Sequence, residues 1–289
     1  EDTTTGSHNT AVGYQAMQLN TTASNNTAVG SGSLYDNTTG TRNTAVGAFA
    51  VENNLSNDNT GVGYYALNAN TTGIQNVAVG SQALDANTTA SYSTAIGYGA
   101  LGANLTGANN TAIGHGTLTA NTTGSENVAV GRIALESNTT GTNNIAIGYG
   151  ALDANTTNSY NIAIGRDALG VNNAAGNNVA IGAFAMDANT TGGSNVAVGH
   201  NALGSNIGGS QLVAVGNGAL DANTTGNYSV AVGSQALEKN TTGANNVAVG
   251  LQALEENTTA DSNTAVGHAC LSENTTGGLN TGVGYEALK

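Results

Sequence analysis

A short apolar pattern, Ala-Val-Gly or Ala-Ile-Gly (Gly-Val-Gly twice), recurs along the chain. We call its last glycine the anchor and number the following positions +1, +2 and so on. Fifteen of the sixteen intervals between anchors are 17 residues long, and the interval from Gly47 to Gly63 is 16. The pattern shows no boundary and predicts one continuous repeat domain over residues 1–289. The 17 anchors are Gly13, Gly30, Gly47, Gly63, Gly80, Gly97, Gly114, Gly131, Gly148, Gly165, Gly182, Gly199, Gly216, Gly233, Gly250, Gly267 and Gly284.

Each repeat joins a β-branched segment to polar segments rich in Asn, Thr and Gly. Residues 76–80, Asn-Val-Ala-Val-Gly, are typical of a short strand, and residues 223–226, Asn-Thr-Thr-Gly, are typical of a turn. We expect a second short extended segment through Ala-Leu at +3 and +4. Because 17 residues are too few for a strand–helix–strand crossover, the sequence predicts an all-β fold. That fold is a parallel β-solenoid, or β-roll, of about 17 coils with a 17-residue repeat.

Alternation within the strand assigns its two faces. The Ala and the anchor Gly admit almost no volume, so we place them inside a narrow coil. The opposite face then forms a long apolar stripe, which a monomer rarely exposes. We therefore expect a side-by-side homo-oligomer, with the stripe covered by other copies. Its residues are Val79, Ile96, Ile113, Val130, Ile147, Ile164, Ile181, Val198, Val215, Val232, Val249 and Val266.

Position +7 is Asn in every available copy. Stacked amides can hydrogen-bond to one another and to turn backbone, so we expect a structural ladder. Asn-Thr-Thr also matches the N-glycosylation motif, but a buried Asn would not be accessible to glycosylation. The ladder comprises Asn20, Asn37, Asn54, Asn70, Asn87, Asn104, Asn121, Asn138, Asn155, Asn172, Asn189, Asn206, Asn223, Asn240, Asn257 and Asn274.

Composition narrows the class of protein. The chain has 42 Gly, no Pro, no Trp and only 8% charged residues, which excludes a thick globular core. A 39% hydrophobic content argues against disorder. Five Lys and Arg against a net charge of −13 leave no basic surface for nucleic acid. The sequence has no run of 18 apolar residues, so it predicts no membrane-spanning helix.

Candidate chemistry is sparse. His115, His200 and His268 share position +1 but lie four or five coils apart, too far to share a metal. Asp221, Glu238 and Glu255 stack at +5 in consecutive coils and are weak candidates for Ca²⁺, although a solvated acidic edge is the favoured interpretation. We find no catalytic constellation and no cofactor motif. The sequence predicts a protein that is not an enzyme.

Threonine columns raise a minor alternative, an ice-binding solenoid. Adjacent Thr residues in extended backbone point opposite ways, so only one column could face water. That column is interrupted by Leu55, Leu105, Asn173 and Ile207.

The strand motifs also resemble a known family. Asn-Val-Ala-Val-Gly at 76–80, Asn-Ile-Ala-Ile-Gly at 161–165 and Asn-Thr-Ala-Val-Gly at 263–267 resemble the YadA-like head repeats of trimeric autotransporter adhesins. Some phage tail-fibre proteins have similar repeats. The resemblance implies a left-handed β-roll, a homotrimer and an extracellular adhesin head that contacts a host-surface protein or glycan. The alternative is a tail-fibre shaft on a virion.

The two ends of the sequence also match. Reading from Leu288-Lys289 into residues 1–4, Glu-Asp-Thr-Thr, nearly reproduces residues 254–259. We expect that copies stack end to end into filaments, or that the chain continues in a longer fibre.

Overall fold

The chain folds as an all-β, parallel β-solenoid whose strands recur about every 17 residues, which confirms the predicted fold class. The computed structural model describes residues 5–173 and 175–289, so the expected joining segment at residues 1–4 lies outside the described part. Seventeen three-residue strands precede the seventeen anchors. They are β1 (Thr10–Val12), β2 (Thr27–Val29), β3 (Thr44–Val46), β4 (Thr60–Val62), β5 (Val77–Val79), β6 (Thr94–Ile96), β7 (Thr111–Ile113), β8 (Val128–Val130), β9 (Ile145–Ile147), β10 (Ile162–Ile164), β11 (Val179–Ile181), β12 (Val196–Val198), β13 (Val213–Val215), β14 (Val230–Val232), β15 (Val247–Val249), β16 (Thr264–Val266) and β17 (Thr281–Val283).

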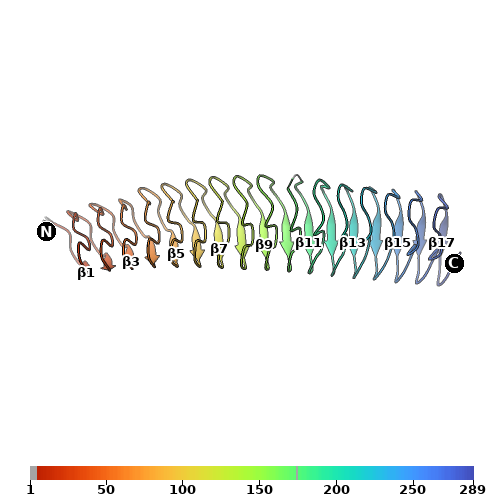
Figure 1. Cartoon of the computed structure of the whole chain (residues 1–289), viewed down its shortest axis with the longest axis horizontal. Helices are drawn as coiled ribbons and strands as arrows, with labels where there is room; N and C mark the ends of the chain where they lie inside the picture. The colour runs from red at the N-terminus through yellow and green to blue at the C-terminus, as the bar shows by residue number, and fades with distance from the viewer. Residues whose placement is uncertain (1–4, 174) are drawn as a thin grey trace. The chain divides into compact units, whose positions relative to one another are not determined.

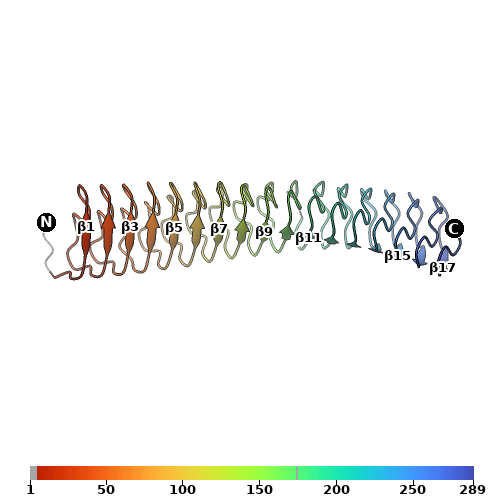
Figure 2. The same cartoon turned by 90° about the horizontal axis from the view of Figure 1, so that it is seen from below.

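The chain divides into two compact units, residues 1–144 with β1–β8 and residues 145–289 with β9–β17. Within each unit, every strand pairs in parallel with the next, and equivalent residues of the repeat lie opposite each other, as Ala95 does with Ala112. The strands lie side by side on one face of the unit, and the rest of each coil loops behind them (Figures 1 and 2). We name each coil by the strand before its anchor, so the β6 coil carries Gly97.

The interior of each unit contains three apolar columns. The central strand Ala, as in Ala95, is fully buried, and so are the Ala and Leu of the turn, as in Ala100 and Leu101. Where Gly61 replaces the strand Ala, even an added Cβ would run into the Val51 side chain, so the interior of the coil is narrow. The predicted placement of the Ala face inside a narrow coil is therefore correct.

The Ala-Leu segment is not extended, and that part of the prediction was wrong. Residues of this segment form turns, and position +4 has a φ of 49–56° in every coil. This is the left-handed region, which costs an L-residue about 1 kcal/mol or more. Leu occupies it because burial of its side chain repays the backbone cost. Sequence reasoning treated Leu as an extended residue because Leu is rarely found at positive φ.

The anchor position requires glycine because of its backbone conformation and its close contact with the next coil, more than because of space in the interior. Its φ is 129–139° throughout, a region essentially closed to other residues. A Cβ added at Gly165 would lie 2.5 Å from the carbonyl oxygen of Gly182 in the next coil. The anchor is thus the point where the chain leaves the strand while touching the neighbouring coil.

In each unit, most neighbouring asparagines at +7 are joined by a hydrogen bond from the later side-chain amide to the Oδ1 of the earlier one. The Asn104 side-chain amide donates to Asn87 Oδ1 at 3.1 Å and to the Gly107 carbonyl of its own turn at 3.0 Å. Asn121 in turn donates to Asn104 Oδ1 at 2.8 Å. Of the ladder residues, Asn20 through Asn257 are buried and Asn274 is half-buried.

A second asparagine column lies at +13, and sequence reasoning missed it. Asn110 Oδ1 accepts the backbone N–H of Asn127 at 3.0 Å, and its amide donates to the Gly124 carbonyl at 2.7 Å. Asn121 of the first column donates to the same carbonyl at 2.9 Å. The two columns therefore converge on one turn oxygen per coil. The signal was available, because Asn stands four residues before 14 of the 17 anchors.

Candidate functional site

The outward face of the strands carries the apolar stripe expected from the sequence. Ile96 is 39% exposed, and Ile113, Ile147, Ile181, Val232, Val249 and Val266 are exposed to a similar degree. Val79, Val130, Ile164, Val198 and Val215 are half-buried. From β9 to β15 the other outward strand position is also Val or Ile, so the second unit presents two adjacent apolar columns. A regular apolar face of this kind is suited to contact with another protein surface.

The threonine columns have distinct environments. At +8 the hydroxyl donates to a carbonyl of the next coil, as Thr88 Oγ1 does to the Leu105 oxygen at 3.1 Å and Thr241 Oγ1 does to the Thr258 oxygen at 2.9 Å. These hydroxyl protons support the stack and are not free to order water. At +9 the residues, such as Thr89 and Thr242, are exposed.

The three histidines at +1 pack on aromatic rings. His115 stacks on Tyr98 with ring centroids 5.4 Å apart, and His268 stacks on Tyr285 at 5.1 Å. His200 meets the Phe184 ring edge-on at 5.9 Å. Within residues 5–173 and 175–289, no three His, Cys, Asp or Glu side chains gather as a group that could hold a metal ion. Calcium binding by Asp221, Glu238 and Glu255 stays a prediction.

Several carboxylates at +5 are partly withdrawn from water. Burial raises the pKa of Asp85, of Asp187 and of Asp221. Nearby Asp167 adds to the rise at Asp187, and Asp187 adds to the rise at Asp221, where His200 opposes it. Ionisation of these aspartates therefore costs the folded state free energy.

We expect the chain to become more stable as the pH falls from 7.5 to 4.5. A carboxyl whose pKa is raised by folding binds its proton more readily in the folded chain than in the unfolded chain, where the pKa is about 3.9. Stability therefore increases as pH falls from above the raised pKa toward that value. Thermal unfolding followed by circular dichroism at both pH values measures the effect.

The triple variant Asp85→Asn, Asp187→Asn, Asp221→Asn should show a smaller rise in melting temperature on acidification. An equal loss of charge through Asp36→Asn, Glu136→Asn and Asp261→Asn is the control and should change the pH dependence less. If the two triple variants respond alike, the raised pKa values are not the cause. Asp58 acts in the opposite direction, because its hydrogen bond to Arg42 lowers its pKa.

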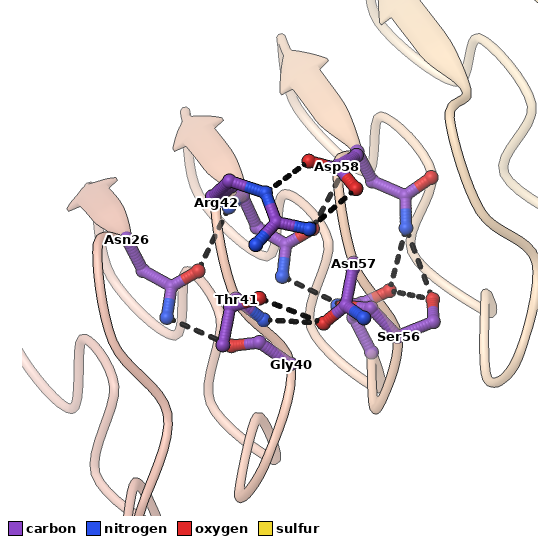
Figure 3. Close-up of polar contacts among 10 residues, drawn as sticks. Asn26, Gly40, Thr41, Arg42, Ser56, Asn57 and Asp58 are labelled. Atoms are coloured by element: carbon purple, nitrogen blue, oxygen red, sulfur yellow. Dashed lines mark hydrogen bonds and ion pairs between the residues drawn. The ribbon is translucent and has the colours of Figure 1, made fainter.

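The 16-residue β3 coil shows how the solenoid absorbs a missing residue (Figure 3). The deletion removes the exposed +9 residue, and the Ser56 carbonyl takes the place of the turn oxygen, accepting from Asn43 at 2.8 Å and from Asn54 at 2.7 Å. Beside it, Arg42 Nε and Nη2 donate to the two oxygens of Asp58 at 2.6 and 2.8 Å. This exposed ion pair joins neighbouring coils, and both asparagine columns continue through the shortened turn.

Comparison with protein-family models finds no match, and comparison with curated proteins finds none either. In the part of the chain that the structure describes, no helical segment has the length and hydrophobicity needed to cross a bilayer. The class of protein that the fold defines is therefore a β-solenoid repeat protein.

Proposed function

We propose that this chain is a non-enzymatic structural protein, a segment of an extracellular fibre or adhesin head that self-associates through its apolar stripe. The exposed Val/Ile face of the strands carries the proposal. It extends through consecutive coils of each unit at one strand spacing, and it bears no charge at any stripe position. Burying it against copies of itself would remove apolar surface from water at about 25 cal/mol per Å².

Three chains around one axis are the arrangement that the family resemblance implies, and a closed ring covers every copy's stripe equally. The acidic net charge of −13 would keep such an assembly soluble and discourage lateral contacts elsewhere. The outer turns, whose residues vary between coils at +1, +2, +5 and +12, would then face the surroundings. Such a segment would add length to the fibre and display its outer turns to the surroundings.

The assembly is tested by sedimentation equilibrium of the full chain. We expect a mass near three times the 28.3 kDa of one chain. Ile164→Lys, Val198→Lys and Val232→Lys together should shift it toward one chain, because each places a charge in the buried stripe. Thr191→Lys, Thr225→Lys and Thr259→Lys change the net charge equally at exposed turn positions and should leave the assembly intact.

A monomeric wild-type chain, or equal behaviour of the two triple variants, would contradict assembly through the stripe. Location is tested separately by immunogold labelling of the native source. Label on intact cells supports an adhesin head, label on virions supports a fibre shaft, and label confined to the cell interior contradicts both.

A further inference from the structure

Two open hollows lie at the same place in the repeat, one in each unit. The Gly102 hollow of the first unit has a volume of about 340 Å³ and is lined by Gln82, Asp85, Tyr98 and Thr119 around Gly102. The Gly204 hollow of the second unit has about 590 Å³ and is lined by Phe184, Asp187, His200, Ser205 and Asp221. Gly102 and Gly204 both occupy position +5, six repeats apart. Volumes of about 300–1,000 Å³ are typical of small-molecule sites.

The first hollow exists because the β6 coil lacks two outward side chains. A Cβ added at Gly99 would meet nothing within 4 Å, so the space above it is open. At Gly102, the nearest side-chain atom to an added Cβ is Asp85 Oδ1 at 3.4 Å. The glycines thus form a floor one coil wide between Asp85 of the preceding coil and Thr119 of the following coil.

An aromatic ring forms one wall of the same hollow. Tyr98 is 55% exposed, and its ring stacks on His115 with an angle of 19° between the planes. The imidazole therefore supports one face of the Tyr98 ring. The preceding coil has only Ser81 at the corresponding position, which leaves room beside the opposite face.

The second hollow repeats this chemistry with other residues. Phe184 and His200 supply the ring pair, and Asp187 and Asp221 supply carboxylates from the coils on either side of Gly204. Asp221 Oδ1 lies 2.6 Å from the place where a Cβ of Gly204 would stand, so the carboxylate leans into the vacant slot. In both hollows a glycine at +5 follows an aspartate at +5 one coil earlier.

We propose that the Gly102 and Gly204 hollows bind neutral sugar residues. A pyranose offers C–H bonds on its ring faces, which suit the electron-rich face of an aromatic ring, and hydroxyl groups at its edge. Carboxylate oxygens accept those hydroxyl protons, and the Gln82 amide in the first hollow both donates and accepts. Neither hollow has Lys or Arg among its lining residues in the described chain, and the aspartates repel anionic sugars.

We expect each of these shallow, open hollows to bind a single sugar weakly. Copies of the chain held together would multiply the attachment through avidity. The inference goes beyond the structural role proposed above and does not depend on it, because a single chain contains complete hollows. Assembly and sugar binding are therefore measured separately.

The test uses saturation-transfer NMR on the full chain with free glucose, galactose, N-acetylglucosamine and N-acetylgalactosamine, and with glucuronate and N-acetylneuraminate as acidic comparators. We expect transfer to at least one neutral sugar and none to the acidic sugars. Surface plasmon resonance on immobilised neutral oligosaccharides then distinguishes recognition of a surface glycan from binding of a free sugar only.

The decisive variant fills both hollows, Gly102→Asn with Gly204→Asn. The repeat accommodates Asn at this position, because Asn68 occupies it in the β4 coil. Binding should fall at least ten-fold, while the melting temperature and the sedimenting mass stay unchanged. Glu136→Asn with Glu255→Asn alters the same position in two coils with no glycine there and should preserve binding.

A second pair, Tyr98→Ala with Phe184→Ala, removes the ring walls and should also reduce binding at least ten-fold. The proposal is overturned if no neutral sugar shows transfer, if only acidic sugars do, or if the signal survives filling of both hollows.

Discussion

Replacing the anchor Gly165 by Ala should destabilise the second unit by about 3 kcal/mol or more. The residue has a φ of 137°, where an L-residue is strained by about 1–3 kcal/mol. Its new Cβ would also lie 2.5 Å from the Gly182 oxygen and 2.6 Å from the Gly182 carbonyl carbon. Both atoms are backbone in the adjoining coil, so relief requires the two coils to separate. Urea unfolding and amide hydrogen exchange measure the loss.

Gly170→Ala is the matched control in the same coil. Gly170 does not lie in the positive-φ region, and the nearest atom to its added Cβ is the Asp167 oxygen at 3.4 Å, an ordinary contact. This variant should change stability by less than about 0.5 kcal/mol. If Gly165→Ala were equally mild, neither the φ of the anchor nor its contact with the next coil would require glycine.

Asn223→Leu should cost about 3 kcal/mol, the second of the large effects. The Asn223 amide donates to Asn206 Oδ1 at 2.8 Å and to the Gly226 carbonyl at 3.1 Å. Its own Oδ1 accepts from Asn240 at 2.9 Å. All three asparagines are buried, and a buried polar group left without a partner costs about 1–3 kcal/mol.

The effect should reach neighbouring coils. Hydrogen exchange should quicken in the turns around Gly226 and Gly243 and should stay unchanged several coils away, because stability in a solenoid is carried by adjacent repeats. Thr225→Val, at an exposed position two residues away, should leave the unfolding midpoint within about 0.5 kcal/mol. A cost as small for Asn223→Leu as for Thr225→Val would show that the amide column contributes little.

The 17-residue period predicts most of the fold from the sequence alone. Fifteen identical intervals fix which residues stack, and the small Ala column fixes which face lies inside. The conformation of the +4 Leu could not be found in this way, since its positive φ arises from the closure of the coil and contradicts the local preference of the residue. The role of the second Asn column, shown by Asn110 and Gly124, depends on which carbonyl the turn presents to it.

The two hollows on the surface could not be predicted from the sequence either. Gly102 and Gly204 look, in the sequence, like two more small residues in a glycine-rich chain. They can be recognised as the floors of two hollows only when the stacking of the coils places the preceding Asp and the ring pairs beside them. The apolar stripe was easier to predict, because its residues share one position in every repeat. Predicting it did not require the conformation of the turn.

The register of the strands has a genetic consequence. Since each strand residue pairs with its equivalent one repeat later, duplication or loss of 17 codons adds or removes one whole coil and leaves the strand register of the remaining coils unchanged. The shortened β3 coil marks where smaller changes are tolerated, at the tip of the outer turn and not in the strand or the anchor. Such a gene can lengthen or shorten its product by unequal recombination between repeats, so the number of coils is free to vary between descendants while the architecture is inherited intact.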